Sequence, residues 1–336
     1  MTNSCDIAII GASSPIGEAI LEQLAEQQVP VGNVIPLAFD DALDSTVPFA
    51  GKHLHMQDLA TFNFANVPLV ILCQLDETYQ AIVDRILDAD CRVIEMGSNL
   101  QHATVVVAEV NSDAECLQQN QHIRSASGLG VVLIQLLKPI NDKWGIQSLH
   151  FTALQSVSDK GKQGIDELAM QTTSLLNTRP IKPSVFKQQI AFNVMADDSE
   201  INATGFTHRE LDLREELQDL LFADSDSSVS LMPSLLHVPV FYGVAVDVHL
   251  ELKSDVDLHE FEQLIASSEN TELKFVDDII SPVSHAAELD KIFINRVRQD
   301  LGNSRQLNFW CVTDTIRSGS AINGVQIVEI LVKHHL

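Results

Sequence analysis

The sequence predicts an α/β protein with two domains, an N-terminal domain built on a parallel sheet and a second domain of the α+β type. Three observations predict this class. The chain opens on a strand, a glycine turn and a helix. Strand and helix patterns then alternate to about residue 127, and Val244–Leu252 alternates apolar with polar residues along one strand. The length of 336 residues suffices for two domains with substantial cores.

The opening strand, turn and helix have the pattern of a Rossmann-type nucleotide-binding domain. Ile7–Ile10 predicts a strand buried on both faces, and Pro15 suits the first turn of the following helix. Free N–H groups and the helix dipole meet at this turn and favour an anion. The candidate cofactor-binding residues are Gly11, Ser13, Ser14, Ile16 and Gly17. Ser14 stands where the usual fingerprint has its second glycine, so an ordinary strand–helix turn without a ligand remains the alternative.

Alternation continues through the first domain, with strands predicted at Asn33–Phe39, Leu69–Cys73, Arg92–Met96 and Thr104–Val107, and a helix at Thr78–Asp88. Asp40 and Asp41 follow the second strand of the chain, Asn33–Phe39, where an acid can bind ribose hydroxyls. The same acids would repel a 2′-phosphate, which favours NAD over NADP. Alternatively, they only open a solvated turn.

A different pattern follows about residue 145 and predicts a mixed sheet with few crossovers. A buried helix at Val131–Leu137, ended by Lys138–Pro139, leads into it. Expected strands are Leu149–Val157, a segment within Val229–Leu252, Leu273–Val276, Ile292–Arg298 and Leu307–Val312; expected helices are Lys160–Leu176, Leu211–Phe222, one that carries Leu258, Phe261 and Leu264, and a closing helix at Arg317–Val332. We expect Ser254 or Asp255 to cap the helix that carries Phe261.

Composition excludes several classes of partner. The net charge of −25 disfavours binding to nucleic acid or to an anionic membrane. No apolar run could span a bilayer, and the polar N-terminus does not predict a signal peptide. Five scattered cysteines without a CxxC pair indicate free thiols in the cytoplasm. His53 and His55 point the same way on an expected strand, but no third ligand is evident, so no metal is expected.

Six short motifs, in order, resemble the aspartate-semialdehyde dehydrogenase family over nearly the whole chain. They are Gly11–Ala12 with Gly17, Ala108–Asn111, Leu137–Pro139, Gln155–Lys162, Val238–Gly243 and Arg317–Asn323. The resemblance implies a nucleotide-binding domain completed by the C-terminal helix, with Asn323 as a further cofactor-binding residue. It also implies a second domain that carries catalysis and forms a homodimer. Members of the family reduce aspartyl phosphate to the semialdehyde with NADPH.

The catalytic positions implied by the resemblance carry other residue types here. The family's cysteine nucleophile corresponds to Gly128, counted back from Lys138–Pro139. The glutamine that orients the intermediate is retained as Gln155. The arginine that grips the substrate carboxylate corresponds to His237, and the acid–base histidine corresponds to Val244. Three further basic residues of the family also have other residue types here. An arginine that binds phosphate corresponds to Gln101, and the arginine that binds the NADP phosphate corresponds to a position near Asp41. A lysine at the start of a helix corresponds to Asp212.

Two classes of function therefore compete. One is a catalytically degenerate homologue that acts as a dimeric binding module, with weak binding of NAD or NADP or of another small-molecule ligand. The other is an active NAD(P)-dependent oxidoreductase on an aldehyde or acyl substrate. Gly128 separates them because glycine cannot form a thioester. We expect residues 1–127 with 315–336 to form the nucleotide-binding domain and residues 128–314 to form the dimerisation domain.

Overall fold

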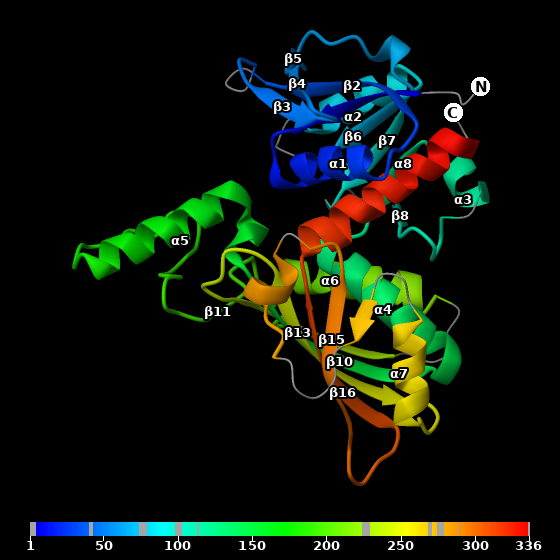
Figure 1. Cartoon of the computed structure of the whole chain (residues 1–336), viewed down its shortest axis with the longest axis vertical. Coiled ribbons are helices and arrows are strands. Elements are labelled where there is room, and N and C mark those ends of the chain that lie inside the picture. Colours follow the sequence, from blue (N-terminus) through cyan, green and yellow to red (C-terminus); the bar gives the residue numbers. More distant parts are fainter. Residues whose placement is uncertain are drawn as a thin grey trace. The chain divides into compact units, whose positions relative to one another are not determined.

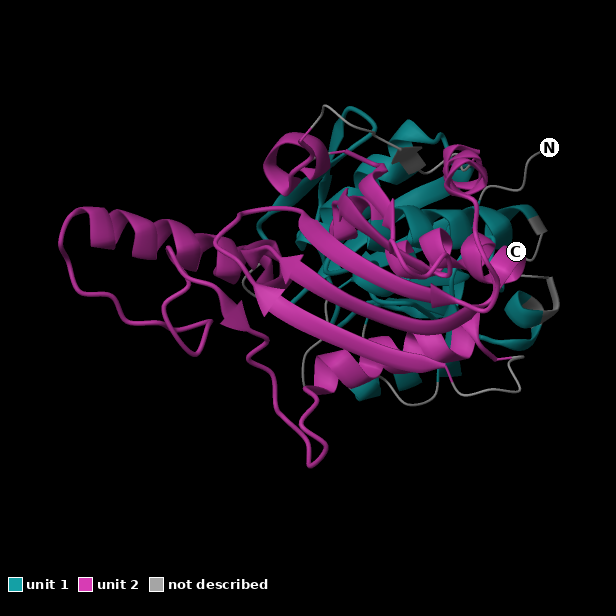
Figure 2. Ribbon diagram, turned by 90° about the horizontal axis from the view of Figure 1, so that it is seen from below, with its two compact units in different colours: residues 1–131, 319–336 teal, residues 132–318 magenta. Residues whose placement is uncertain are grey.

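The computed structural model describes residues 5–39, 43–73, 79–97, 103–112, 114–223, 229–267, 271–273, 279–287 and 289–334 (Figure 1). Two compact units divide the chain. Residues 1–131 and 319–336 form unit 1, and residues 132–318 form unit 2 (Figure 2). The predicted fold class is confirmed, because unit 1 contains a parallel sheet and unit 2 a mixed one.

Unit 1 contains a seven-stranded sheet in the order β5-β2-β1-β6-β7-β9-β8, in which each pair of neighbours is parallel. Its strands are β1 (Cys5–Ile10), β2 (Val31–Ala38), β5 (Gln57–Asp58), β6 (Leu69–Leu72), β7 (Arg92–Met96), β8 (Thr104–Val106) and β9 (His122–Ser125). The strands β3 (Thr46–Phe49) and β4 (Lys52–His55) form a separate hairpin. The strand order reverses between β1 and β6, which is where open α/β sheets bind ligands.

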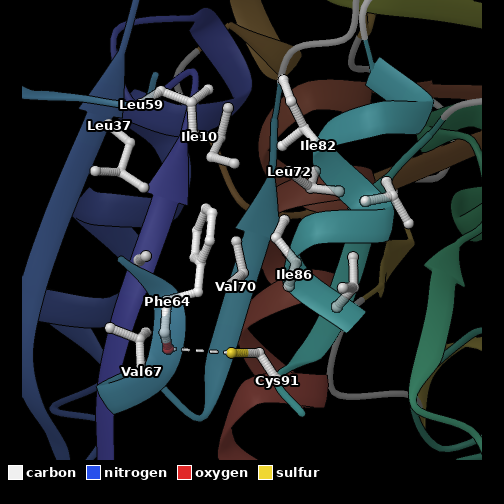
Figure 3. Packing of buried hydrophobic residues seen from close by; sticks show 13 residues of the cluster. Ile10, Leu37, Leu59, Phe64, Val67, Val70, Leu72, Ile82, Ile86 and Cys91 are labelled. Atoms are coloured by element: carbon white, nitrogen blue, oxygen red, sulfur yellow. Dashed lines mark hydrogen bonds between the residues drawn. The ribbon is translucent and has the colours of Figure 1, made fainter. Parts of the chain in front are cut away.

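The helices of unit 1 are α1 (Pro15–Glu26), α2 (Tyr79–Asp88), α3 (Ala114–Gln119) and α8 (Ile322–His334). One hydrophobic cluster joins Ile10 of β1 and Val70 of β6 to Ile86 of α2, and Figure 3 shows these side chains packed between the sheet and the helix. Burial of each such aliphatic side chain contributes about 1.5–3 kcal/mol. The thiol of Cys91 donates a hydrogen bond to the carbonyl of Phe64 at 3.3 Å beside this cluster.

Unit 2 contains a seven-stranded mixed sheet in the order β11-β12-β10-β13-β16-β15-β14. Its strands are β10 (Ile146–Gln155), β11 (Met195–Ala196), β12 (Ser230–His237), β13 (Val244–Leu252), β14 (Thr271–Leu273), β15 (Ile292–Gln299) and β16 (Gln306–Thr313). The predicted alternation of β13 is confirmed, because Val246, Val248 and Leu250 are buried while His249 is exposed. The strand β10 pairs in parallel with β12 and antiparallel with β13.

The helices that lie mostly or wholly in unit 2 are α4 (Gly128–Trp144), α5 (Gly161–Leu176), α6 (His208–Leu221) and α7 (Leu258–Ala266). Two helix boundaries correct the sequence expectation. Asp257, and neither Ser254 nor Asp255, caps α7 by accepting a hydrogen bond from the Glu260 N–H at 3.0 Å. The helix α4 continues through Pro139 to Trp144, because burial of the residues beyond it outweighs the lost backbone hydrogen bond.

The closing helix is also corrected at its start. Residues Thr315–Ala321 form a π-helical segment, and the regular helix α8 begins only at Ile322. None of the described helices is both long enough and apolar enough to cross a membrane.

Candidate functional site

The glycine turn of unit 1 is built around backbone contacts and one helix cap. Gly11 has a φ of 75°, which favours glycine, and its carbonyl accepts a hydrogen bond from the Ser14 N–H at 2.9 Å. A Cβ on Gly17 would lie 2.3 Å from that same carbonyl oxygen. The first and last glycines therefore have the roles of tight turn and close helix packing that a dinucleotide fingerprint requires.

Ser14 serves the turn as the N-cap of α1. Its hydroxyl accepts a hydrogen bond from the Gly17 N–H at 3.1 Å and donates one to the Cys73 carbonyl at 3.4 Å. Since Cys73 follows β6, this side chain bridges the two strands at which the order reverses. Ser13 is exposed on the turn and Ile16 is partly exposed.

Asn323 is enclosed within unit 1. Its side chain accepts from the Ala108 N–H at 2.7 Å and donates to the Val106 carbonyl at 3.0 Å and to the Ser125 hydroxyl at 2.8 Å. The residue is fully buried, so it fastens α8 to the ends of β8 and β9. Its contact with a cofactor stays a prediction. Asp40, together with Asp41 and Gln101, lies outside the described residues.

Three of the four candidate catalytic positions lie side by side at one end of the unit 2 sheet. Gln155 ends β10 and is the register partner of both His237 on β12 and Val244 on β13. All three side chains are buried. Residues 82 and 89 positions apart in the sequence therefore meet on adjacent strands, as expected for residues of one site.

A network of alternating charges surrounds His237. Arg209 contacts Asp159 at 2.7 Å through Nη2 and Asp197 at 3.0 Å through Nη1. The His237 Nε2 lies 3.3 Å from Asp197 and 3.7 Å from Asp198. Lys160 closes the network, with Nζ 2.9 Å from Asp198 Oδ1. The network thus holds three carboxylates, two permanent cations and one imidazole.

Two carboxylates of the network, Asp197 and Asp198, are stabilised in their charged form. Burial by itself raises the pKa of Asp197, but contacts from His237, Ser199 and Arg209 outweigh burial and hold that pKa well below its usual range. The same balance lowers the pKa of Asp198, with Lys160 as the main stabilising contact. His237 is completely buried, and Phe186 packs edge-on against its ring at 5.3 Å.

Gly128, the remaining candidate position, lies at the start of α4. A Cβ on Gly319 would come within 2.3 Å of the Gly128 carbonyl oxygen, so the two backbones are closely packed. Ser127 caps the helix by accepting from the Gly130 N–H at 3.1 Å. The Ser125 hydroxyl donates to the Ala126 carbonyl at 3.0 Å. Both serine hydroxyls therefore have structural partners.

Four of the cysteines have a raised thiol pKa, so none of these four is an activated nucleophile. Burial raises the pKa of Cys311 to about 12, and burial with the nearby Asp6 raises the pKa of Cys5 to about 11. Burial also raises the pKa of Cys73 and Cys91. A thiol of this kind is a poor nucleophile at neutral pH.

The charge network contains five residues with no role predicted from the sequence, namely Asp159, Lys160, Asp197, Asp198 and Arg209. Two of them were visible within the motif Gln155–Lys162 but had no assigned role. Arg209 follows Thr207, which forms a capping box with Glu210. That local pattern could have placed Arg209 on the first turn of α6, but nothing local indicates its partners.

Comparison with known proteins identifies the class to which these two units belong. Residues 6–117 match the family model described as "Semialdehyde dehydrogenase, NAD binding domain", and residues 137–318 match "Semialdehyde dehydrogenase, dimerisation domain". Fold and comparison together place the chain in the semialdehyde dehydrogenase class, with an NAD-binding and a dimerisation domain.

The chain belongs to the aspartate-semialdehyde dehydrogenase family. It is 33% identical to "Aspartate-semialdehyde dehydrogenase 2" of Vibrio cholerae serotype O1, over 100% of both chains. It is 30% identical to a "USG-1 protein homolog" of Pseudomonas aeruginosa, also over 100% of both. The crystal structure of aspartate semialdehyde dehydrogenase II from Vibrio cholerae, complexed with ASA, superposes with a TM-score of 0.93 at 32% identity, covering 99% of this chain and 100% of that one.

Proposed function

We propose that this chain is a dimeric, dinucleotide-binding member of the family that does not reduce aspartyl phosphate. The observation that carries the proposal is the pair of residue types at Gly128 and Val244. The family reaction needs a thiolate to attack an acyl phosphate, a hydride to reduce the thioester, and a histidine to move the protons. Gly128 has no nucleophile and Val244 cannot exchange a proton.

The structural surroundings support this proposal. Val244 lies in register beside the retained Gln155, which favours the correspondence of both with family site positions. His237 lacks the two-pronged fork of arginine, and its ring is enclosed by Asp197 and Phe186. General acid–base catalysis is typically worth about 10²–10⁴-fold, and the loss of the nucleophile adds to that. Turnover should therefore fall below detection.

A second candidate is an active NAD(P)-dependent oxidoreductase on an aldehyde or acyl substrate. The names of the relatives favour this function over the first, because several relatives at 29–33% identity over the full chain are called aspartate-semialdehyde dehydrogenase. It requires a nucleophile other than the residue at Gly128. Ser127 is the nearest hydroxyl in the sequence, and Cys116 is the partly exposed cysteine of the described chain.

For the cofactor, we propose weak binding that prefers NAD to NADP. The match to an NAD binding domain and the glycine turn support a nicotinamide dinucleotide, which would supply or accept a hydride when bound. The glycine turn lies at the N-terminus of α1, whose dipole favours the negative charge of a pyrophosphate. Asp40 and Asp41 would repel a 2′-phosphate at a cost on the order of 1 kcal/mol.

We further propose that a second copy of the chain covers one face of the unit 2 sheet. The match to a dimerisation domain supports this contact. On the face opposite the buried valines of β13 lies an open cavity of about 690 Å³, and its polar lining includes Ser148, His150, His249, Glu251, Arg298 and Asn308. We also propose that the protein acts in the cytoplasm, because free cysteines suit a reducing compartment.

The reverse reaction tests the proposal. Purified protein is incubated with the semialdehyde, phosphate and either NAD or NADP, and reduced cofactor is followed by absorbance. We expect no turnover above the rate without protein. Turnover abolished by Ser127→Ala or by Cys116→Ala alone would establish the second candidate. Turnover that survives both changes would show that the site has been misplaced, and either result would contradict the first candidate.

A further inference from the structure

We propose that His150 and His249 together bind a divalent transition-metal ion such as Zn²⁺ on the unit 2 sheet. The pair lies on the face of the sheet opposite the buried valines of β13, and we call it the sheet-face site. Both imidazoles come from one chain, so the inference goes beyond the proposed function and requires neither catalysis nor a second copy. The pair is also distinct from His53 and His55, at which the sequence predicted no metal.

The two histidines of the sheet-face site are register partners on neighbouring strands. His150 of β10 lies opposite His249 of β13 in an antiparallel pair, and both residues are exposed. Residues opposite each other in such a pair point to the same face, with Cβ atoms about 4.5–5.5 Å apart. Zinc–nitrogen bonds of about 2.0–2.1 Å place two tetrahedral ligands about 3.3 Å apart. Two imidazoles at this cross-strand spacing can therefore bind one ion.

A carboxylate orients the ring of His249. Asp247 Oδ2 lies 3.0 Å from His249 Nε2, and the Asn308 side-chain amide donates to Asp247 Oδ1 at 3.0 Å. Asn308 is buried, which anchors this series of contacts in the sheet. When the carboxylate accepts from Nε2–H, the lone pair of the ring lies on Nδ1, as in metal-bound histidines that donate their other N–H to a carboxylate. Asp247 is therefore a positioning residue for a ligand at His249 Nδ1.

The sheet-face site has room for the rest of a coordination sphere. Both histidines line an open cavity of about 690 Å³ whose polar lining also includes Ser148. Two imidazoles fill two of the four positions of a tetrahedral ion, and water from the cavity can fill the others. Among the described residues, three potential ligand groups come within 4.8 Å of one another only at Asp197, Asp198 and His237. The sheet-face site is therefore a chelate of two imidazoles, with the orienting carboxylate outside it.

The charges around the cavity favour a cation over an anion. With both histidines neutral, the carboxylates of Asp247, Glu251 and Asp300 exceed the two arginines, Arg298 and Arg305, by one negative charge. The guanidinium of Arg305 lies 3.6 Å from Glu251, and Arg298 donates to a backbone carbonyl at 3.1 Å. Imidazole nitrogens bind Zn²⁺, Cu²⁺ and Ni²⁺, whereas Mg²⁺ and Ca²⁺ prefer oxygen ligands. The site should thus bind Zn²⁺ in the presence of Mg²⁺.

Zinc titration of the metal-free, full-length protein tests the inference. The protein is stripped with EDTA, dialysed, and titrated with zinc chloride by calorimetry at neutral pH in excess magnesium chloride. We expect the tightest zinc site to hold one ion per chain. His150→Gln and His249→Gln should each weaken this binding at least about tenfold, because each removes one of the two protein ligands. His53→Gln is the matched control, since it removes an exposed histidine of another pair, and it should leave the affinity unchanged.

Asp247→Asn separates orientation of the ring from a role in folding. Loss of an outer partner of a metal-bound histidine typically weakens metal binding about 10–100-fold, and we expect a loss in this range. The Tm without metal should stay close to that of the wild type, because the Asp247 side chain is 37% exposed and such ion pairs contribute little to stability. A lower Tm with unchanged zinc affinity would contradict the positioning role.

Three results would overturn the inference. The first is a wild-type protein that binds no zinc in this titration. The second is zinc binding that His150→Gln and His249→Gln both retain. The third is zinc binding that is lost with His237→Ala or His53→Gln instead, because the ion would then lie at the charge network or at the β3–β4 hairpin. Light scattering of the same samples reports whether the chain is a dimer, so a failure of the proposed second copy is detected separately from a failure of the metal site.

Discussion

The glycine turn of unit 1 and the charge network of unit 2 are built from different kinds of group. The turn depends on backbone contacts and on the absence of side chains at Gly11 and Gly17. The network consists of side chains, and Arg209 and His237 both contact the carboxylate of Asp197. A site built from backbone keeps its shape as long as its glycines remain. A site built from side chains changes with each single substitution.

The largest effect should follow from breaking the network at Asp197. We expect Asp197→Asn to lower the free energy of unfolding by about 3–5 kcal/mol at pH 7, because it removes one charge from a buried pair. Glu200→Gln, an exposed neighbour, should have little effect. Urea unfolding of the three proteins measures the difference, and equal losses for both variants would contradict a buried ion pair at this position.

The same pair predicts a direction for pH. The folded-state pKa of Asp197 lies below its ordinary value of 3.8, so its contribution is complete above that value and is lost as the pH falls through the folded pKa. The stability difference between wild type and Asp197→Asn should therefore be constant between about pH 5 and 7 and shrink toward pH 2. A difference that grows on acidification would have the wrong sign.

A smaller effect should follow from breaking the turn. Gly17→Ala places a Cβ against the Gly11 carbonyl and the Ala12 backbone, which cannot move as a side chain would. We expect a loss of about 1–3 kcal/mol, with any NAD binding weakened as the turn shifts. Gly302→Ala is the matched control, since its nearest neighbour is an Asp300 side-chain oxygen at 3.4 Å. Equal melting temperatures for both variants would show that the turn tolerates a side chain.

The variant Ser14→Gly should have the smallest effect on stability, and it tests most directly how the turn binds a cofactor. Ser14→Gly restores the second glycine of the fingerprint, and a change from serine to glycine at an N-cap costs only a few tenths of a kcal/mol. We expect NAD to bind more tightly to the variant, because the side chain near the pyrophosphate is removed. Titration calorimetry with NAD and NADP measures both affinities. Weaker NAD binding by the variant would mean that the Ser14 hydroxyl itself contacts the cofactor.

Much of the fold could be predicted from local patterns. The run Ile7–Ile10, with its glycine turn, predicted β1 and α1, and the alternation of Val244–Leu252 predicted β13 with its buried face. These features follow from the periodicity of apolar side chains, which is visible within a short stretch of the sequence. Pro139 shows where local rules fail: proline usually ends a helix, yet burial of Ile140 and Trp144 carries α4 past it.

The sequence by itself determined which chemical groups this protein can bring to a site. Gly128 has no thiol and Val244 has no exchangeable proton in any fold, so these absences needed no structure. Only the tertiary structure decided the partners of His237. Asp197 and Arg209 are 40 and 28 residues away from His237 in the sequence, and their contact depends on how residues 161–202 and α6 return to the end of β12. Whether two charged groups form an ion pair depends on the distance between them in the folded chain, and no local periodicity in the sequence predicts that distance.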